Sequence, residues 1–414
     1  MSQGLRHFTH HIGGGLASVE EGAAILRHNP ADRREAIGTV PIGTRATAQA
    51  AIAAAARAYP EWAATPAPTR ARIIRKAGEL ARQRIEELAL AMTLEAGKPL
   101  KESRGEINKG ILVLDYYDGA GLRLRGEVTP AEANDVFTYT QRFPLGVVAL
   151  ITPWNFPWAV PLWKIAPALV AGNTIVWKPN PLTPWTSECI MELFRDAGLP
   201  DGVLNLVHGE GEAGEELVRN PTVQAVSFTG STTVGRQIYR TAAERALSRV
   251  LCELGGKNAV VVMPDADLEL AVTGIVGGAF VSVGQRCTAT SRVLVHADVA
   301  TRVTEMIVAR AKALKVGPGL DPETQMGPVV SEEHCRRIIA AIEAATLGGI
   351  RCLTGGSRLT DGALVYGSFV APTVFDEVPP NCKLFHDEVF GPVLGITTVA
   401  SYPEAINFLN AVEY

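Results

Sequence analysis

The sequence predicts an α/β fold: a Rossmann-like, doubly wound parallel sheet, a second α/β domain and a projecting β-hairpin arm. Three observations indicate it. Strand-like apolar runs alternate with helical segments between residues 147 and 254, a second alternating block runs from residue 258 onward, and a turn-rich stretch of alternating residues precedes the first block. With 414 residues, 47% apolar content and 20% charge, the chain can form two or three packed domains.

Helices are predicted first along the chain. Residues 46–100 are rich in Ala, Arg, Glu and Leu at helical spacing and end at Gly97 and Pro99, which predicts amphipathic surface helices. Residues 106–122 continue this pattern. Residues 124–143 change to alternating residues on either side of a Pro/Ala/Asn/Asp turn, which predicts a hairpin that projects from the main body.

The next segment repeats a strand followed by a crossover helix. Its strand-like runs are GVVALIT, NTIVWKP, GVLNLVHG, AVSFTG and RVLCELGG. The helical runs between them are WAVPLWKIAPALVAG, SECIMELFRDAG, EELVRN and TTVGRQIYRTAAERA. This alternation is typical of a doubly wound parallel sheet, whose crevice at the carboxyl ends of the strands binds nucleotides.

Composition excludes several classes of function. The formal net charge of −4 gives no basic excess, which argues against a nucleic-acid partner. Six scattered cysteines without a C-x-x-C pair indicate reduced thiols, and no apolar run has the length of a signal core or a membrane span, so we expect a cytoplasmic protein without membrane contact. His7, His10 and His11 lie in a polar terminus that we expect to be frayed or loosely docked, and no metal site is expected.

Two segments could bind an anion. AVSFTGSTTVGR places a strand, a turn at Gly230 and Ser231, and a helix in order, so backbone N–H groups and the positive end of the helix dipole would face a pyrophosphate. The G-x-x-x-x-G spacing is equally compatible with a plain tight turn. Lys178 ends a strand and precedes Pro179, where it could bind a ribose or phosphate, although a solvated loop lysine is the alternative.

Two polar side chains stand out among apolar neighbours. Glu253, in RVLCELGGKN, is expected to be a buried carboxylate; with a raised pKa it would suit a general base, and a structural salt bridge is equally open. Asn155, in ITPWNFPW, follows another strand and could donate to a developing oxyanion.

Cys287, in GQRCTAT, is the candidate nucleophile. Gly284 allows close backbone approach, Arg286 supplies a positive charge that favours the thiolate, and the small residues after Cys287 leave its sulfur accessible. A small buried core thiol is the alternative.

Four stretches, PWNFP, VSFTGSTTVGR, CELGGKN and GQRCTA, occur in this order, and together they resemble the aldehyde dehydrogenase superfamily. The resemblance extends from NPADRREAIGTVPIG to HDEVFGPVLG. It implies that Cys287 attacks the aldehyde carbon, that Asn155 and the Cys287 backbone N–H stabilise the oxyanion, and that Glu253 activates the water that hydrolyses the thioester.

The same resemblance implies further site residues. Those for the cofactor, NAD or NADP, are Lys178 at the adenosine ribose or its phosphate, Gly230 and Ser231 at the pyrophosphate, Glu388 and Phe390 at the nicotinamide ribose, and Thr152 and Trp154 along the cleft. Those for the substrate tunnel are Phe156 and Trp163, which are equally open to being core residues. An arginine directly before the nucleophile, here Arg286, resembles the branches of the family that act on anionic aldehydes such as 2-oxoglutarate semialdehyde, succinate semialdehyde or glyceraldehyde 3-phosphate. A packing role is the alternative for Arg286.

The sequence departs from the family pattern in two places. Pro181 replaces a glutamate common in members that prefer NAD, so NADP is expected to be accepted and even preferred. Family members also continue beyond the point that matches AVEY, so we expect the last domain to be incomplete and its activity and oligomer to be affected.

The resemblance also assigns roles to the domains. We expect a dinucleotide-binding domain at 1–123 and 147–254, an oligomerisation hairpin at 124–146 and a catalytic domain at 255–414, with a homodimer or homotetramer when full length. The rival functions are a non-catalytic relic of the family, which would tolerate loss of the catalytic residues, and a cofactor-free thiol esterase, which does not explain Lys178 or Glu388.

Overall fold

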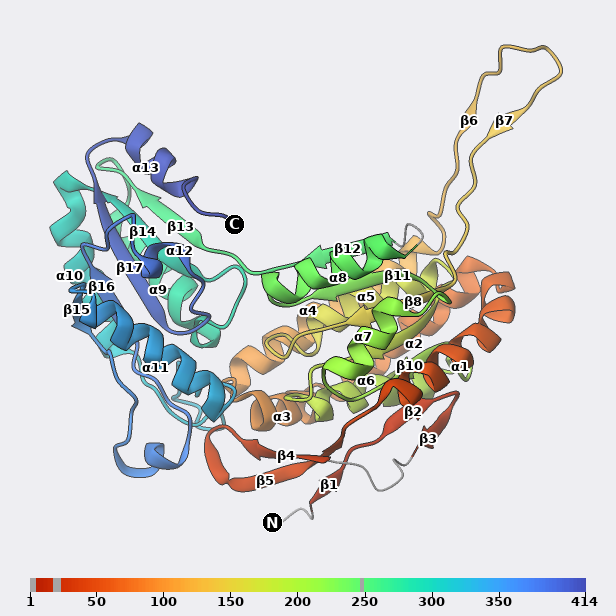
Figure 1. The fold of residues 1–414 in the computed structure, drawn as a ribbon, viewed down its shortest axis with the longest axis horizontal. Coiled ribbons are helices and arrows are strands. Elements are labelled where there is room, and N and C mark those ends of the chain that lie inside the picture. The colour runs from red at the N-terminus through yellow and green to blue at the C-terminus, as the bar shows by residue number, and fades with distance from the viewer. Residues whose placement is uncertain (1–4, 18–23, 246–248) are drawn as a thin grey trace. The chain divides into compact units, whose positions relative to one another are not determined.

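The computed structural model describes residues 5–17, 24–245 and 249–414 (Figure 1). The chain forms two compact units. The first contains Met1–Arg27, Gly38–Ala91 and Arg104–Glu253, and the second contains His28–Ile37, Met92–Ser103 and Leu254–Tyr414. Each unit has helices around a largely parallel sheet, which confirms the predicted α/β class.

The sheet of the first unit has the order β12, β11, β8, β9, β10, β2, β3 within the described residues. Its parallel strands are β8 (Val147–Ile151), β9 (Thr174–Lys178), β10 (Leu204–Leu206), β11 (Val223–Thr229) and β12 (Arg249–Glu253). The antiparallel strands are β2 (His10–Ile12) and β3 (Gly15–Ala17). Strands β9 and β10 are buried throughout, which explains why apolar residues predominate in their sequences.

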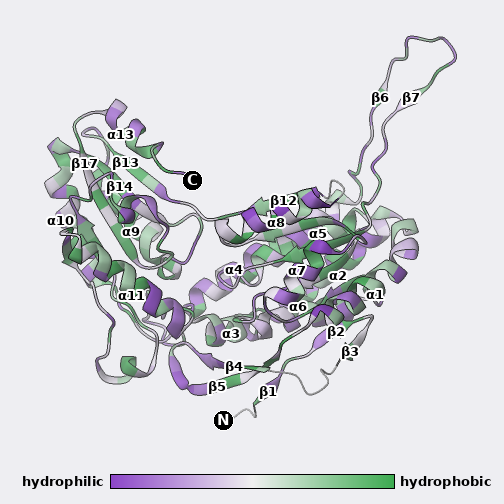
Figure 2. Ribbon diagram, viewed as in Figure 1, coloured by the Kyte–Doolittle hydropathy of each residue, from purple (hydrophilic) through white to green (hydrophobic). Residues whose placement is uncertain are grey.

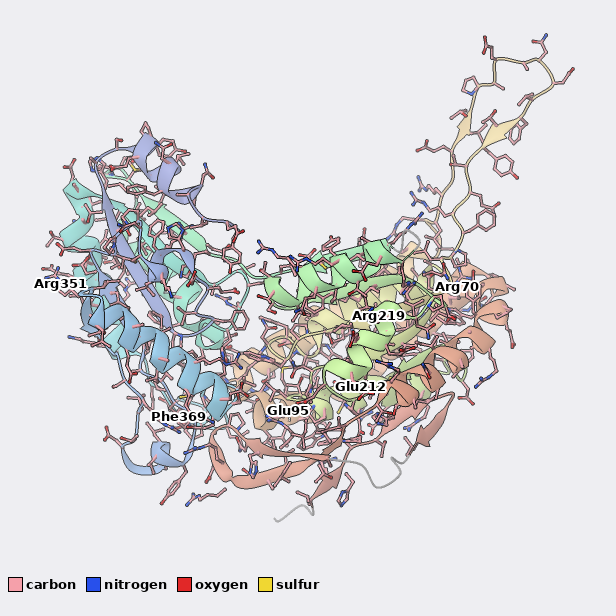
Figure 3. The ribbon with its side chains drawn as sticks, in the orientation of Figure 1. Arg70, Glu95, Glu212, Arg219, Arg351 and Phe369 are labelled. Carbon is pink, nitrogen blue, oxygen red and sulfur yellow. The ribbon has the colours of Figure 1, made fainter. Side chains whose placement is uncertain are left out.

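Helices cover this sheet. They are α1 (Arg45–Ala64), α2 (Ala67–Gln83), α5 (Ala159–Val170), α6 (Pro184–Asp196), α7 (Gly211–Arg219) and α8 (Thr232–Glu244), while α3 (Ile85–Ala96) and α4 (Leu100–Ala120) continue into residues of the second unit. Helix α1 packs on α7 and β9, and α5 packs on β8 and β9. Arg70 of α2, labelled in Figure 3, is buried and donates to the Val170 carbonyl at 3.0 Å. Its burial lowers the pKa of the guanidinium.

The N-terminal segment departs from expectation. Strand β2 pairs antiparallel with β10. The His10 ring is buried, and its Nδ1 accepts the His208 backbone N–H at 3.1 Å. A loosely docked terminus was therefore the wrong expectation for this strand, because the exposed edge of β10 supplies backbone partners that its local sequence does not reveal.

The described strands outside the two main sheets form two smaller sheets. One has the order β1 (Arg6–His7), β5 (Asp32–Pro41), β4 (Ala24–Asn29). The other pairs β6 (Val128–Thr129) with β7 (Thr138–Tyr139) in the hairpin that projects at the upper right of Figure 1. This confirms a hairpin within residues 124–143, while its use in oligomerisation stays a prediction.

The sheet of the second unit has the order β13 (Asn258–Val262), β14 (Thr290–His296), β17 (Val393–Val399), β16 (Thr373–Asp376), β15 (Arg351–Thr354), and only β15 is antiparallel among these described strands. Its helices are α9 (Leu268–Phe280), η1 (Val281–Gly284), α10 (Ala297–Ala313), α11 (Glu332–Leu347), η2 (Gly362–Tyr366), α12 (Lys383–His386) and α13 (Tyr402–Leu409). Figure 2 shows apolar residues along β14 and β17 and polar residues on the surface of α11. Arg351, labelled in Figure 3, pairs with Asp376 across β15 and β16.

None of the described helices combines the length and apolar character required to cross a bilayer.

Candidate active site

The candidate residues of the first unit lie along one edge of its sheet. Lys178 ends β9 opposite Ile151 of β8, and Glu253 ends β12 opposite Thr229 of β11. Gly230 follows β11 directly and donates its N–H to the Glu253 carbonyl at 3.1 Å. The parallel strands thus bring these residues to their carboxyl ends, where ligands of doubly wound sheets bind.

Lys178 is a buried lysine with donor capacity. Its side chain is 8% exposed, and its Nζ donates to the Pro179 carbonyl over a long 3.4 Å. Burial lowers the pKa of this ammonium to about 8, while attraction by Glu210 opposes the shift. Since an ammonium has three donors, the oxygen atoms of a ribose or phosphate fit this group.

The N-terminus of α8 fits an anion. Ser231 is its N-cap and accepts the Val234 N–H at 3.4 Å. A Cβ on Gly230 would lie 2.5 Å from the Phe228 ring, so glycine is required for this tight turn. The dipole of the 13-residue helix favours negative charge here, as a dinucleotide pyrophosphate would provide.

The turn between β8 and α5 holds three predicted residues. Thr152 accepts the Trp177 indole N–H at 2.8 Å and donates its backbone N–H to the Lys178 carbonyl at 3.2 Å. Trp154 is half-buried, and Asn155 is 7% exposed. The amide is therefore held within a packed turn, as an oxyanion donor requires.

Glu106 is a buried residue that sequence reasoning missed. Its carboxylate accepts the backbone N–H groups of Trp158 at 3.0 Å and Ala159 at 3.1 Å, so it fixes the start of α5 directly after the Asn155 turn. No local sequence signal identifies it, because the carboxylate comes from α4, about fifty residues earlier.

Helix α5 also carries Phe156 before its first turn, Trp163 and Lys164. Phe156 is half-buried and Trp163 is 45% exposed, so Trp163 is not a core residue of its unit. Lys164, which sequence reasoning missed, donates to the Ser227 hydroxyl at 2.8 Å. Burial lowers the pKa of Lys164 to about 8, opposed first by attraction from Glu253. A lysine within an apolar helix was the available signal.

The expected burial of Glu253 is wrong. This residue is exposed, and β12 alternates between exposed and half-buried residues. The reason is the strand order: among the described strands β12 lies at the edge of the sheet and pairs with β11 alone. An exposed carboxylate can reach water directly.

In the second unit Cys287 is the only exposed cysteine of the six, all of which belong to the described residues. This excludes the buried core thiol. The preceding turn is left-handed at three consecutive residues: Ser282 has φ 54°, Val283 has φ 58° and Gly284 has φ 66°. The turn projects the thiol out of a packed segment, because Ser282 and Val283 are themselves buried.

The LGGKN segment organises the nucleophile loop. Asn258 donates its side-chain amide to the Cys287 carbonyl at 2.7 Å and to the Ala289 carbonyl at 3.2 Å. A Cβ on Gly256 would lie 2.7 Å from the same Cys287 carbonyl oxygen, so glycine is required for this approach. The LGGKN motif is visible in the sequence, whereas its contacts with the nucleophile loop are not.

The same segment holds the predicted Glu388. The Gly256 N–H donates to the Glu388 carboxylate at 3.1 Å. Burial raises the pKa of Glu388, and this hydrogen bond and Lys257 oppose the shift. Lys257 donates to the Asp387 carbonyl at 2.7 Å, and burial lowers its pKa to about 8. Glu388 therefore presents a fixed, half-buried carboxyl group, which suits ribose hydroxyls.

Phe390 and Arg286 line one pocket with Glu388. Phe390 has a left-handed backbone, φ 56°, and its carbonyl lies 2.8 Å from His334 Nε2. The Arg286 Nη2 donates to the carbonyls of Gly277 at 3.2 Å and Gly278 at 2.8 Å, at the end of α9. The Arg286 Nε is buried without a hydrogen-bond partner among the described residues.

The candidate residues thus form two groups, one in each unit. The first contains Asn155, Lys178 and Glu253 with their neighbours, and the second contains Cys287 and Glu388 with theirs. Within the described ranges, no group of three His, Cys, Asp or Glu residues has the arrangement of a metal site.

Comparison with known proteins identifies the family. The model of the aldehyde dehydrogenase family matches residues 18–414. A 2,5-dioxopentanoate dehydrogenase from Saccharolobus solfataricus is 42% identical over 395 residues, which cover 95% of this chain and 82% of the relative. An alpha-ketoglutaric semialdehyde dehydrogenase from Bacillus subtilis is 40% identical, with 97% of this chain and 83% of the relative covered.

Solved structures agree with this assignment. A betaine aldehyde dehydrogenase from Staphylococcus aureus in complex with NAD+ superimposes with a TM-score of 0.95 at 35% identity, covering 98% of this chain and 81% of that one. These findings confirm the predicted fold, the class of oxidoreductases acting on aldehydes, and a nicotinamide dinucleotide as cofactor. The chain belongs to the aldehyde dehydrogenase family.

Proposed function

We propose that this chain oxidises an anionic semialdehyde to the corresponding acid, with Cys287 as nucleophile. The single observation that carries the catalytic assignment is the exposed Cys287 on a left-handed turn beside the LGGKN segment. The substrate class is supported by relatives named for 2,5-dioxopentanoate and alpha-ketoglutaric semialdehyde. Arg286 directly precedes the nucleophile, and its positive charge would attract a substrate carboxylate.

The proposed reaction uses both groups of residues. The Cys287 thiolate attacks the aldehyde carbon to form a thiohemiacetal, and the Asn155 amide with the Cys287 backbone N–H stabilises the oxyanion. When bound, the nicotinamide supplies the acceptor for the hydride that leaves this carbon. The resulting thioester is cleaved by a water molecule that Glu253 deprotonates, which releases the acid and the thiol.

Lys164 is proposed as a partner of Glu253 in this last step. Burial lowers the pKa of Lys164 to about 8, and attraction by Glu253 is the largest of the effects that oppose this decrease. An ammonium with this pKa can exchange a proton with solvent near neutral pH. It would stabilise the Glu253 carboxylate before the water is deprotonated, and Glu253 would afterwards release the proton it has taken up to solvent.

Several of the candidate residues are proposed to hold the cofactor. Lys178 would bind the adenosine ribose or its phosphate, Ser231 and Gly230 the pyrophosphate, and Glu388 the nicotinamide ribose. Pro181 follows Lys178 without a carboxylate that would repel a 2′-phosphate, so we propose that NADP+ is accepted and preferred. Pro181→Glu should shift the ratio of the two kcat/KM values toward NAD+ by about tenfold, since ~1.4 kcal/mol of repulsion corresponds to that factor.

The hairpin of residues 124–146 is proposed as an oligomerisation arm of a homodimer or homotetramer. It exposes large apolar side chains, which include Val128, Phe137, Tyr139 and Phe143. Light scattering should give a dimer or tetramer for the wild type and a smaller species for Phe137→Ser with Tyr139→Ser. A wild-type monomer at micromolar concentration would contradict this assignment.

An aldehyde panel with both cofactors tests the function. Succinate semialdehyde and 2-oxoglutarate semialdehyde should give kcat/KM values at least tenfold above a neutral aldehyde of similar length, and Arg286→Ala should remove most of that preference. Cys287→Ser should abolish turnover in every case. Equal values for charged and neutral aldehydes would leave the oxidation in place and refute the substrate class.

A further inference from the structure

The turn before Cys287 adopts a conformation that its residues disfavour. Ser282 and Val283 have φ values of 54° and 58°, in the left-handed region where a Cβ approaches the carbonyl oxygen. Valine is β-branched and rarely found there. Such a conformation persists only where surrounding contacts determine it.

One side chain makes two of these contacts. Glu102 lies in the first turn of α4, and its carboxylate accepts the Ser282 hydroxyl at 2.7 Å and the Ser282 backbone N–H at 3.2 Å. Both residues belong to the second unit. Hydrogen bonds to an ionised carboxylate are roughly twice as strong as neutral ones, so this pair restrains the turn more than two neutral hydrogen bonds would.

The restraint continues toward the nucleophile. The Gln285 backbone N–H donates to the Ser282 carbonyl at 2.9 Å, and the Gln285 side chain accepts the Val330 N–H at 3.1 Å. Val283 is 2% exposed and packs in the core of its unit. Cys287 follows two residues after Gln285, so a shift at Ser282 changes the direction in which the thiol projects.

We infer that Glu102 is a positioning residue that holds the left-handed turn and thereby the Cys287 thiol in its reactive orientation. This inference rests on the proposed role of Cys287. It assigns a function to a carboxylate that contacts neither cofactor nor substrate in the proposed reaction. Its loss should lower kcat and the intrinsic reactivity of the thiol, and it should change KM little.

The experiment measures the rate at which iodoacetamide alkylates Cys287, followed by mass spectrometry of the Cys287 peptide, without aldehyde or cofactor. Glu102→Gln keeps the size of the side chain but removes the negative charge and one of the two acceptor oxygens, so alkylation should slow about tenfold. Ser103→Ala is the matched control. It is the next residue of α4 and loses a buried hydrogen bond to Thr93 at 2.8 Å without contacting the turn. Its alkylation rate should equal that of the wild type.

A second pair of variants separates positioning from general stability. In the Glu102→Gln background, Ser282→Gly and Ser282→Ala remove the same hydroxyl, but only glycine adopts a left-handed backbone without penalty. The glycine variant should therefore regain alkylation by about fivefold over the alanine variant, since alanine in the left-handed region carries a steric penalty that glycine lacks. If Glu102→Gln does not fold, Ser282→Ala against Ser282→Gly in the wild-type background carries the same comparison.

The outcomes are distinct. Wild-type alkylation of Cys287 that is no faster than that of the half-buried cysteines would refute the proposed nucleophile. A reactive wild-type Cys287 with unchanged rates in Glu102→Gln would refute only the role of Glu102. Equal rates for the glycine and alanine variants would likewise overturn the inference, because the left-handed turn would then not limit the thiol.

Discussion

Replacing Gly256 by alanine should impair catalysis by moving the nucleophile loop. A Cβ at this position would lie 2.7 Å from the Cys287 carbonyl oxygen, a distance that real Cβ atoms do not adopt. That carbonyl also accepts the Asn258 amide at 2.7 Å, so it cannot retreat without weakening this bond. Relief requires a shift of roughly half an ångström, and since misplacement by about 1 Å can cost a hundredfold in rate, kcat should fall about tenfold.

The stability change should be modest and separable from the catalytic loss. Overpacking of this kind costs typically ~1–3 kcal/mol, which lowers the melting temperature by a few degrees. Gly274→Ala is the matched control, because Gly274 lies in α9 of the same unit with no atom within 4 Å of an added Cβ. Alanine in a helix gains roughly 0.5–1 kcal/mol over glycine, so this control should melt higher with unchanged kcat.

The assay compares kcat and Cys287 alkylation in both variants with the wild type. Gly256→Ala should reduce both quantities, whereas Gly274→Ala should reduce neither. If Gly256→Ala turned over within twofold of the wild type, the contact between LGGKN and the nucleophile loop would not position the thiol, and the reasoning would be refuted.

Two further predictions concern pH. Because the pKa of Lys178 is lowered to about 8, its positive charge is lost as pH rises through that value, so KM for NADP+ should rise between about pH 7 and 9 more than KM for NAD+. Lys178→Met should remove this difference, and equal pH profiles for both cofactors in the wild type would contradict it. Burial and the nearby His11 lower the pKa of His10 from 6.5 to about 4. As the pH falls, His10 is therefore protonated in the unfolded chain at a higher pH than in the folded chain. The contribution of neutral His10 to the free energy of unfolding should be fully present above pH 6.5, and it should fall by up to about 3 kcal/mol as the pH decreases toward 4. His10→Asn, which keeps an acceptor for the His208 N–H, should reduce this dependence in urea titrations but not remove it, because burial also lowers the pKa of His208; an unchanged slope would refute the assignment to His10.

Local patterns were sufficient for the alternation of strands and helices. Buried parallel strands need apolar side chains on both faces, so runs such as TIVWK are recognisable. The positions of Lys178 and Gly230 at one sheet edge also follow from the sequence, because the carboxyl ends of parallel strands share an edge. The predicted roles of the domains and site residues stay predictions.

Local sequence patterns do not predict which strands pair or which distant residues form hydrogen bonds. The exposure of Glu253 depends on β12 being the edge strand, and the burial of His10 depends on β2 pairing with β10. Both are properties of strand order. Likewise, Glu106 and Asn258 act through hydrogen bonds to partners far along the chain, for which periodicity gives no signal.

We propose that Glu253 activates the water that hydrolyses the Cys287 thioester. Mass spectrometry of Glu253→Gln, incubated with 2-oxoglutarate semialdehyde and NADP+, tests it most directly. The account predicts one equivalent of reduced cofactor and a stable acyl adduct on the Cys287 peptide, since the thioester forms but is not hydrolysed. An unmodified Cys287, or steady turnover at the wild-type rate, would contradict the claim.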